Sequence, residues 1–232
     1  MSSLLIKERP ADGAPSGLLV LHHGRGTTEN DLLPLADELD EERRLHVVSI
    51  RAPFTVPGAP GYHWYAVPRV GYPDPESFAT SYRALAEVHD ELWERTRLGP
   101  EQTILGGFSM GTVMSYALGL GGDRPAPAGI LAFSGFVPTV EGWEPDLASR
   151  EQLRAFIAHG RQDPVIDVAF ARRARDLLSG AALTVEYHES DVGHHIDPAH
   201  VSLARRWLER TLSPGPKFTL VEDPAPDAAR EG

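Results

Sequence analysis

Short apolar runs alternate along the chain with longer segments in which apolar residues recur at helical spacing. The apolar runs predict strands at residues 4–7, 17–22, 46–50, 103–108, 129–134, 154–159 and 183–188. The segments with helical spacing predict helices at residues 29–40, 75–97, 109–120, 167–179 and 198–212. Strands and helices in alternation are typical of an α/β domain, with a mostly parallel central sheet and helices on both of its faces.

Two segments stand outside this alternation. Residues 51–75 are rich in proline, glycine and aromatic residues, and a loop of this length in a compact domain tends to be functional, so we expect it to wall a site. Residues 213–232 read as a C-terminal tail, in which residues 217–221 could add a short edge strand and the last ten residues are expected to be disordered. Residues 1–212 are therefore predicted to form a single domain.

Composition narrows the classes of protein. The 232 residues, 41% of them hydrophobic, suffice for one substantial core, and the net charge of −11 argues against a nucleic-acid partner. The absence of cysteine excludes disulfides, thiolate chemistry and Cys-ligated zinc. No apolar run is long enough to span a membrane or to form a signal-peptide core, so we expect a cytoplasmic protein without a membrane span. The sequence leaves open whether the chain forms a homodimer.

The most informative motif is Gly-Phe-Ser-Met-Gly at residues 107–111, between a predicted strand and a predicted helix. A Gly-x-Ser-x-Gly turn in that setting holds a nucleophilic serine in a strained conformation, and larger side chains at the glycines would collide with neighbouring backbone. The pattern can also arise by chance in a chain rich in glycine and serine. Its place between strand and helix favours Ser109 as a nucleophile.

A serine hydroxyl needs a histidine base and an acid that orients it, in the chain order Ser, acid, His in this kind of fold. The predicted strand at 154–159 is followed by Asp163 and Asp167, and the one at 183–188 is followed by His194 and His195. We favour Asp163, because Asp167 stands where it could cap a helix, and His194, because it comes first after Gly193. The short spacing between these residues leaves no room for a cap domain.

Acyl transfer also needs two backbone N–H donors for the oxyanion. Met110, next to the nucleophile, supplies one, and the loop His-His-Gly-Arg-Gly at residues 22–26 supplies the other through Arg25. The same loop is a weak match to a phosphate-binding loop, because Glu29 stands where Gly-x-Gly-x-x-Gly requires glycine. Adjacent histidines in extended chain point in opposite directions, so we expect no metal site.

These motifs resemble the phospholipase/carboxylesterase family of α/β-hydrolases, which includes bacterial carboxylesterases and acyl-protein thioesterases. The resemblance runs from about residue 17 to residue 212 and rests on HHGRGTTENDLLPLA, HWY at 63–65, GFSMG, SGFVP at 134–138, HGRQDPVI and GHHID. It implies a lidless serine esterase that needs no cofactor, acts on small-molecule esters and uses Ser109, Asp163 and His194. His22 and Arg25 depart from the family pattern and bear on acyl-chain preference.

The aromatic and apolar residues of these motifs suggest walls for the acyl or alcohol group, with packing in the core or rim as the alternative. They are Trp64, Tyr65, Phe136 and Val137. Thioesters, lysophospholipids and activated amides remain alternative substrates, because they share the tetrahedral oxyanion. A non-catalytic binding module on the same fold is the alternative from another class.

Overall fold

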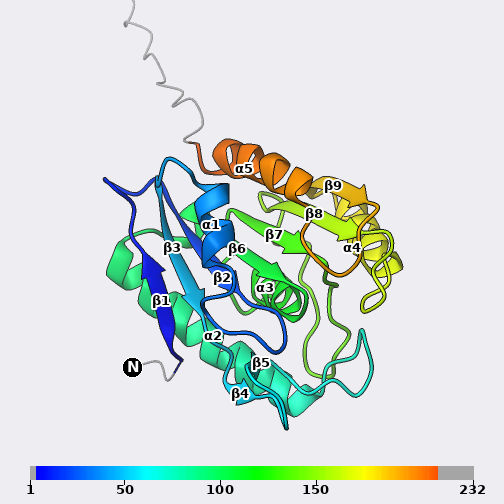
Figure 1. Ribbon diagram of the computed structural model, residues 1–232. Coiled ribbons are helices and arrows are strands. Elements are labelled where there is room, and N and C mark those ends of the chain that lie inside the picture. The colour runs from blue at the N-terminus through cyan, green and yellow to red at the C-terminus, as the bar shows by residue number, and fades with distance from the viewer. Residues whose placement is uncertain (1–3, 214–232) are drawn as a thin grey trace, which may run out of the picture.

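The computed structural model describes residues 4–213, and a seven-stranded sheet with the order β1-β3-β2-β6-β7-β8-β9 forms its centre (Figure 1). Its strands are β1 (Ile6–Arg9), β2 (Gly17–His22), β3 (Leu45–Ile50), β6 (Thr103–Phe108), β7 (Gly129–Phe133), β8 (Arg154–Gly160) and β9 (Thr184–Ser190). The edge strand β1 is antiparallel to β3, and all other neighbouring strands are parallel. The carboxyl ends of β6, β8 and β9 therefore lie along one edge of the sheet, which is where ligands bind in open α/β sheets.

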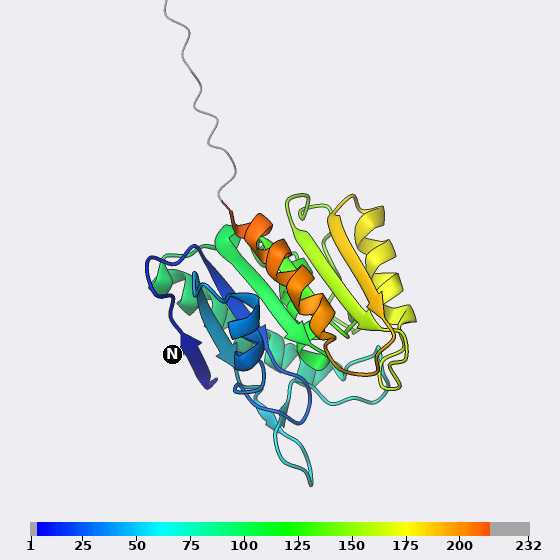
Figure 2. The same ribbon diagram turned by 45° about the horizontal axis from the view of Figure 1, so that its top comes forward.

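Helices cover both faces of the sheet (Figure 2). One face carries α1 (Leu33–Leu39) and α5 (Pro198–Leu212), and the other carries α2 (Pro75–Thr96), α3 (Met110–Leu120) and α4 (Ala169–Gly180). A 3₁₀ turn at Pro100–Gln102 leads into β6. Alternate residues of β2 serve the two cores, since Leu18 packs with α2 and α3 whereas Leu19 packs with α1 and α5.

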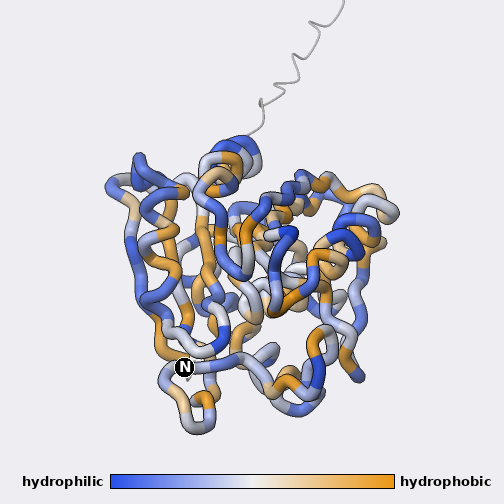
Figure 3. Tube along the Cα trace, turned by 45° about the vertical axis from the view of Figure 1, so that its right-hand side comes forward, coloured by the Kyte–Doolittle hydropathy of each residue, from blue (hydrophilic) through white to orange (hydrophobic). Residues whose placement is uncertain are grey.

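The core lies between these layers. Every residue of β2 and every residue of α3 is buried, which agrees with their continuous apolar character. In Figure 3 hydrophobic segments run along the inner strands, whereas hydrophilic stretches prevail along the outer helix α5. The predicted α/β class with a mostly parallel sheet and helices on both faces is thus confirmed.

The first strand and the first helix differ most from their predicted bounds, whereas seven other elements differ by one or two residues at an end. The first strand covers Ile6–Arg9, two residues later than expected, because its polar end is held by partners far along the chain. The guanidinium of Arg9 lies 2.5 Å from the carboxylate of Asp40, at the end of α1. An apolar run cannot signal a strand end that depends on a buried ion pair.

The helix expected over 29–40 begins only at Leu33. The carboxylate of Glu29 accepts two hydrogen bonds from Arg51, at 2.5 and 2.8 Å, and the N–H of Asp31 donates to Thr28 at 3.1 Å in a turn. This ion pair holds Glu29 beside Arg51, the residue that follows β3. The helix therefore starts after the turn, near Pro34, which is favoured in a first helical turn.

The long loop between β3 and α2 contains a small hairpin that the sequence did not predict. Its strands are β4 (Phe54–Thr55) and β5 (Tyr62–His63). The expected edge strand and disorder at 214–232 lie outside the described residues. Within residues 4–213 no helix is long and apolar enough to cross a membrane.

Candidate active site

Ser109 occupies the turn between β6 and α3 with φ 55° and ψ −120°, a conformation that costs energy for a residue with a side chain. The turn is held in place from the neighbouring strand, because the N–H of Ser109 donates to the carbonyl oxygen of Phe133 at 2.9 Å. The hydroxyl thus stands at the carboxyl end of the central strand and before the first turn of α3, where the helix dipole favours negative charge.

The two glycines that flank Ser109 are required by close backbone contacts. A Cβ atom at Gly107 would lie 2.5 Å from the carbonyl carbon of Gly111, and one at Gly111 would overlap the carbonyl oxygen of His22. The second contact brings the start of α3 directly against the end of β2. The Gly-x-Ser-x-Gly pattern therefore reflects the close packing of the end of β6 on the first turn of α3, and of that turn on the end of β2.

The structure brings three sequence-predicted side chains into one hydrogen-bonded line. The Nε2 atom of His194 lies 2.9 Å from the hydroxyl of Ser109, and its Nδ1 atom lies 2.6 Å from the Oδ2 atom of Asp163. The carboxylate can only accept, so Nδ1 carries a proton and Nε2 of the neutral ring accepts the proton of the serine hydroxyl. Asp163 and Ser109 are both 8% exposed, so the line is shielded from solvent along most of its length.

Asp163 is held as a carboxylate. Burial alone would raise its pKa, but the hydrogen bonds from His194 and from the N–H groups of Ile166 and Val165 outweigh burial and lower the pKa of Asp163. These N–H groups donate to Oδ1 at 2.9 and 2.8 Å, which leaves Oδ2 for His194. The acid is thus charged and oriented before any substrate binds.

A second histidine supports this carboxylate and was not singled out from the sequence. The Nε2 atom of His159, at the end of β8, lies 2.8 Å from the carbonyl oxygen of Ile166 and 3.3 Å from Oδ2 of Asp163. A carbonyl oxygen only accepts, so Nε2 of His159 carries a proton. The sequence feature that could have identified His159 is its position at the end of a predicted strand, four residues before Asp163.

The two alternative residues lie elsewhere. Asp167 accepts from the N–H of Ala169 at 2.7 Å and caps the first turn of α4, as the sequence suggested. His195 is exposed, and its own N–H donates to the carbonyl oxygen of Gly193 at 3.0 Å. Neither side chain has a recorded contact with Ser109 or His194. Among residues 4–213 no group of three or more His, Cys, Asp or Glu side chains could hold a metal ion.

The loop after β2 is fixed by the β4–β5 hairpin. The N–H of Gly26 donates to the carbonyl oxygen of Tyr62 at 2.8 Å, and Gly26 has φ 84°, which suits glycine best. The N–H of the preceding residue, Arg25, donates no hydrogen bond within residues 4–213. The N–H of Met110 lies in the first turn of α3, where N–H groups have no intrahelical acceptor. Both donors border the cavity that Ser109 lines.

The buried side chains of His23 and Trp64 hold this loop in position. The sequence did not predict this role for either of them. The Nε2 atom of His23 accepts from the N–H of Ala52 at 3.0 Å, so in the neutral ring Nδ1 carries the proton and donates to the carbonyl oxygen of Gly24 at 2.7 Å. Burial lowers the pKa of His23, which favours this neutral form. The indole of Trp64 donates to the carbonyl oxygen of His23 at 2.8 Å.

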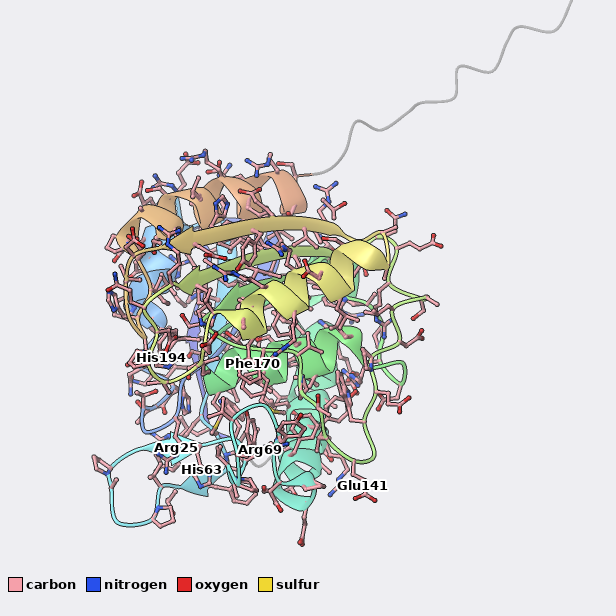
Figure 4. All side chains as sticks on the ribbon, turned by 90° about the vertical axis from the view of Figure 1, so that its right-hand side faces the viewer. Arg25, His63, Arg69, Glu141, Phe170 and His194 are labelled. Atoms are coloured by element: carbon pink, nitrogen blue, oxygen red, sulfur yellow. The ribbon has the colours of Figure 1, made fainter. Side chains whose placement is uncertain are left out.

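A cavity of about 510 Å³ opens beside Ser109. Its apolar lining includes Tyr65, Val67, Val70, Met110, Phe136 and Val165. Arg25 and His63 also line it, and both are labelled in Figure 4. Of the four residues that the sequence suggested as walls, Tyr65 and Phe136 line this cavity. Trp64 and Val137 do not line this cavity: Trp64 is fully buried behind the loop after β2, and Val137 lines a separate groove beside α4.

A mostly parallel sheet with a strained serine turn at the end of its central strand defines the chain as an α/β-hydrolase. The sequence model of the family described as Phospholipase/Carboxylesterase matches residues 8–212, and the chain belongs to this family of hydrolases. Acyl-protein thioesterase 1 homolog 1 of Dictyostelium discoideum is 22% identical to it over 212 residues, covering 85% of this chain and 91% of the relative.

Solved structures agree with this fold. The carboxylesterase of Bacillus cereus superposes with a TM-score of 0.78 at 24% identity, covering 90% of this chain and 95% of that one. Esterase PE8 superposes with a TM-score of 0.74 at 28% identity, covering 90% of this chain and 99% of that one. The resemblance inferred from the motifs is thereby confirmed at the level of the family.

Proposed function

We propose that the protein is a serine carboxylesterase that hydrolyses small to medium carboxylic esters through an acyl-enzyme intermediate. The observation that carries this proposal is the continuous hydrogen-bonded line from Ser109 through His194 to Asp163 at the wall of an apolar cavity. A serine becomes a nucleophile when a base accepts its proton, and the base needs an oriented carboxylate.

In this mechanism His194 takes the proton of Ser109 as the serine oxygen attacks the ester carbonyl carbon. Asp163 keeps the proton on Nδ1 of His194 and stabilises the imidazolium that forms. The N–H groups of Arg25 and Met110 donate to the oxyanion, and His194 then gives its proton to the leaving alcohol. Water, activated by the same histidine, attacks the acyl-enzyme and releases the acid.

A thioesterase that uses the same residues is the second candidate. It is favoured by the family relative that is named an acyl-protein thioesterase homolog. The family description also includes phospholipases, so a lysophospholipid is a further substrate to compare. Hydrolysis of each of these substrates passes through the same kind of tetrahedral oxyanion. Turnover of 4-nitrophenyl esters of increasing chain length, beside an acyl thioester and a lysophospholipid, separates these activities.

The proposal is tested by labelling with a fluorophosphonate. We expect one equivalent to attach to Ser109, and the Ser109→Ala variant to lose both labelling and ester hydrolysis while its thermal midpoint stays near that of the parent. Ser115→Ala is the matched control, because Ser115 lies in α3, the helix that follows Ser109, and is fully buried. Labelling of another serine, or ester turnover by Ser109→Ala near the parent rate, would overturn the mechanism.

A further inference from the structure

The residues described as lining the cavity beside Ser109 carry positive charge without negative charge. Within residues 4–213 its lining contains no acidic side chain, and Arg25 is the one permanently charged residue there. His63 also lines the cavity, and its Nδ1 atom lies 2.9 Å from the carbonyl oxygen of Tyr65, so in the neutral ring Nε2 is left as an acceptor. In a chain with 33 acidic and 22 basic residues, a cavity with this composition stands out from the overall acidic balance.

The guanidinium of Arg25 has no partner within residues 4–213. Within these residues it forms no ion pair, hydrogen bond or ring contact, whereas Arg51 is bound to Glu29 at 2.5 and 2.8 Å. Glu29, the closest acidic side chain along this loop, is thus already paired with Arg51. Arg25 is exposed, so its cation is available to a ligand that enters from solvent.

The backbone that carries this cation is rigid. Gly26, next in the chain, is bound to Tyr62, and the preceding Gly24 accepts from the ring of His23. A guanidinium on a fixed backbone loses less conformational freedom when it binds an anion, and its planar donors match a carboxylate or phosphate. The apolar walls beside it weaken solvent screening of such a pair.

We propose that Arg25 selects esters that carry an anionic group, a carboxylate or phosphate, in the part of the substrate that lies at this end of the cavity. This inference rests on the proposed esterase function, since the ester must also reach Ser109. The substrate class is then an ester in which an apolar segment is followed by an anion. The backbone N–H of Arg25 stabilises the oxyanion, and its side chain recognises the substrate.

The test compares esters that differ in one charge. The monoester of glutaric acid with 4-nitrophenol is paired with 4-nitrophenyl pentanoate, which places the charge on the acyl side. Phenyl butyrate bearing a carboxylate on the ring is paired with unsubstituted phenyl butyrate, which places it on the alcohol side. For each pair the measured quantity is the ratio of kcat/KM for the anionic ester to kcat/KM for the neutral ester.

We expect Arg25→Gln to lower this ratio by about fivefold or more in at least one pair, and Arg25→Lys to restore much of it. The change should shrink as NaCl is raised, because salt screens an exposed charge pair. Arg69→Gln is the matched control: its guanidinium lies 3.7 Å from the ring centroid of Tyr72 and does not line the cavity. Figure 4 shows both arginines on the lower side of the molecule, below His194.

Three outcomes would overturn the inference. An unchanged ratio in both pairs for Arg25→Gln, with esters still hydrolysed, rejects selection by Arg25 and leaves the proposed function standing. An equal fall for Arg69→Gln shows a general effect of net charge instead of recognition. Absence of hydrolysis of every ester by the parent protein rejects the proposed function, and the inference with it.

Discussion

The indole Nε1–H of Trp64 donates a hydrogen bond of 2.8 Å to the carbonyl oxygen of His23. Trp64 is fully buried, and its backbone N–H also lies 3.3 Å from the sulfur of Met110. Through its side chain and its backbone N–H, Trp64 therefore links the loop after β2 to the start of α3, the two segments that carry the proposed oxyanion donors. Trp64 is not among the residues that line the cavity, and we expect it to act by positioning this loop.

The first prediction follows from this contact. Trp64→Phe removes the hydrogen bond and leaves the loop less constrained, so kcat for a short neutral ester should fall about tenfold while KM changes little, since the loss falls on the oxyanion. The thermal midpoint should also fall, because the buried carbonyl oxygen of His23 loses its donor, which costs about 1–3 kcal/mol.

The matched control for that variant is Trp93→Phe. The indole of Trp93 donates to the hydroxyl of Thr103 at 2.9 Å, in a part of the molecule away from the cavity. This variant should lose stability with kcat unchanged. Equal effects of the two variants on kcat would contradict the positioning role of Trp64.

The second prediction separates the adjacent histidines. His194→Ala removes the base that contacts Ser109, and kcat should fall by about 10⁴-fold or more. His195→Ala removes an exposed side chain, and kcat should change by less than about tenfold. Steady-state kinetics on one ester, with circular dichroism to verify folding, measures both. The reverse order of severity would mean that this loop has another arrangement in the working enzyme.

The third prediction concerns stability in acid. His22 and His89 stack in the core with their Nε2 atoms 3.4 Å apart, and the Nδ1 atom of His22 lies 2.8 Å from the hydroxyl of Ser115. Burial, followed by the charge of Arg124, lowers the pKa of His89 to about 3. Burial and the neighbouring His89 lower the pKa of His22 well below its ordinary value.

Both histidines are therefore neutral in the folded protein and take up protons on unfolding below about pH 6.5. The unfolded state then binds more protons, so the free energy of unfolding falls as the pH falls from about 6.5 toward 3, and His89 alone accounts for about 2 kcal/mol at pH 5. Urea unfolding of the parent at pH 7.5 and pH 5 should show this loss.

His89→Phe should be less stable at pH 7.5, because His22 loses its partner, but it should lose less stability between pH 7.5 and pH 5. His195→Gln is the control, since His195 is exposed and should leave the pH dependence of the parent unchanged. An undiminished loss in His89→Phe would show that other groups govern the acid transition.

Local patterns predicted most elements of the fold. The bounds of β2, β6 and α5 were predicted to the residue. An apolar run or a helix cap depends only on residues that are close together in the sequence. The order of Ser109, Asp163 and His194 could also be proposed from sequence, since each follows a predicted strand and parallel strands end at one edge. Their catalytic roles remain predictions until the kinetic experiments are done.

What the sequence by itself determined is the class of fold, the family motifs and the residue types that the serine turn requires. The tertiary structure alone decided that Glu29 pairs with Arg51 outside the helix predicted for it, and that the indole of Trp64 binds the loop after β2. It also decided that Arg25 has no acidic partner within residues 4–213. Each of these depends on side chains far apart in the chain. No local pattern records such contacts, because they exist only once the strands and loops are packed together.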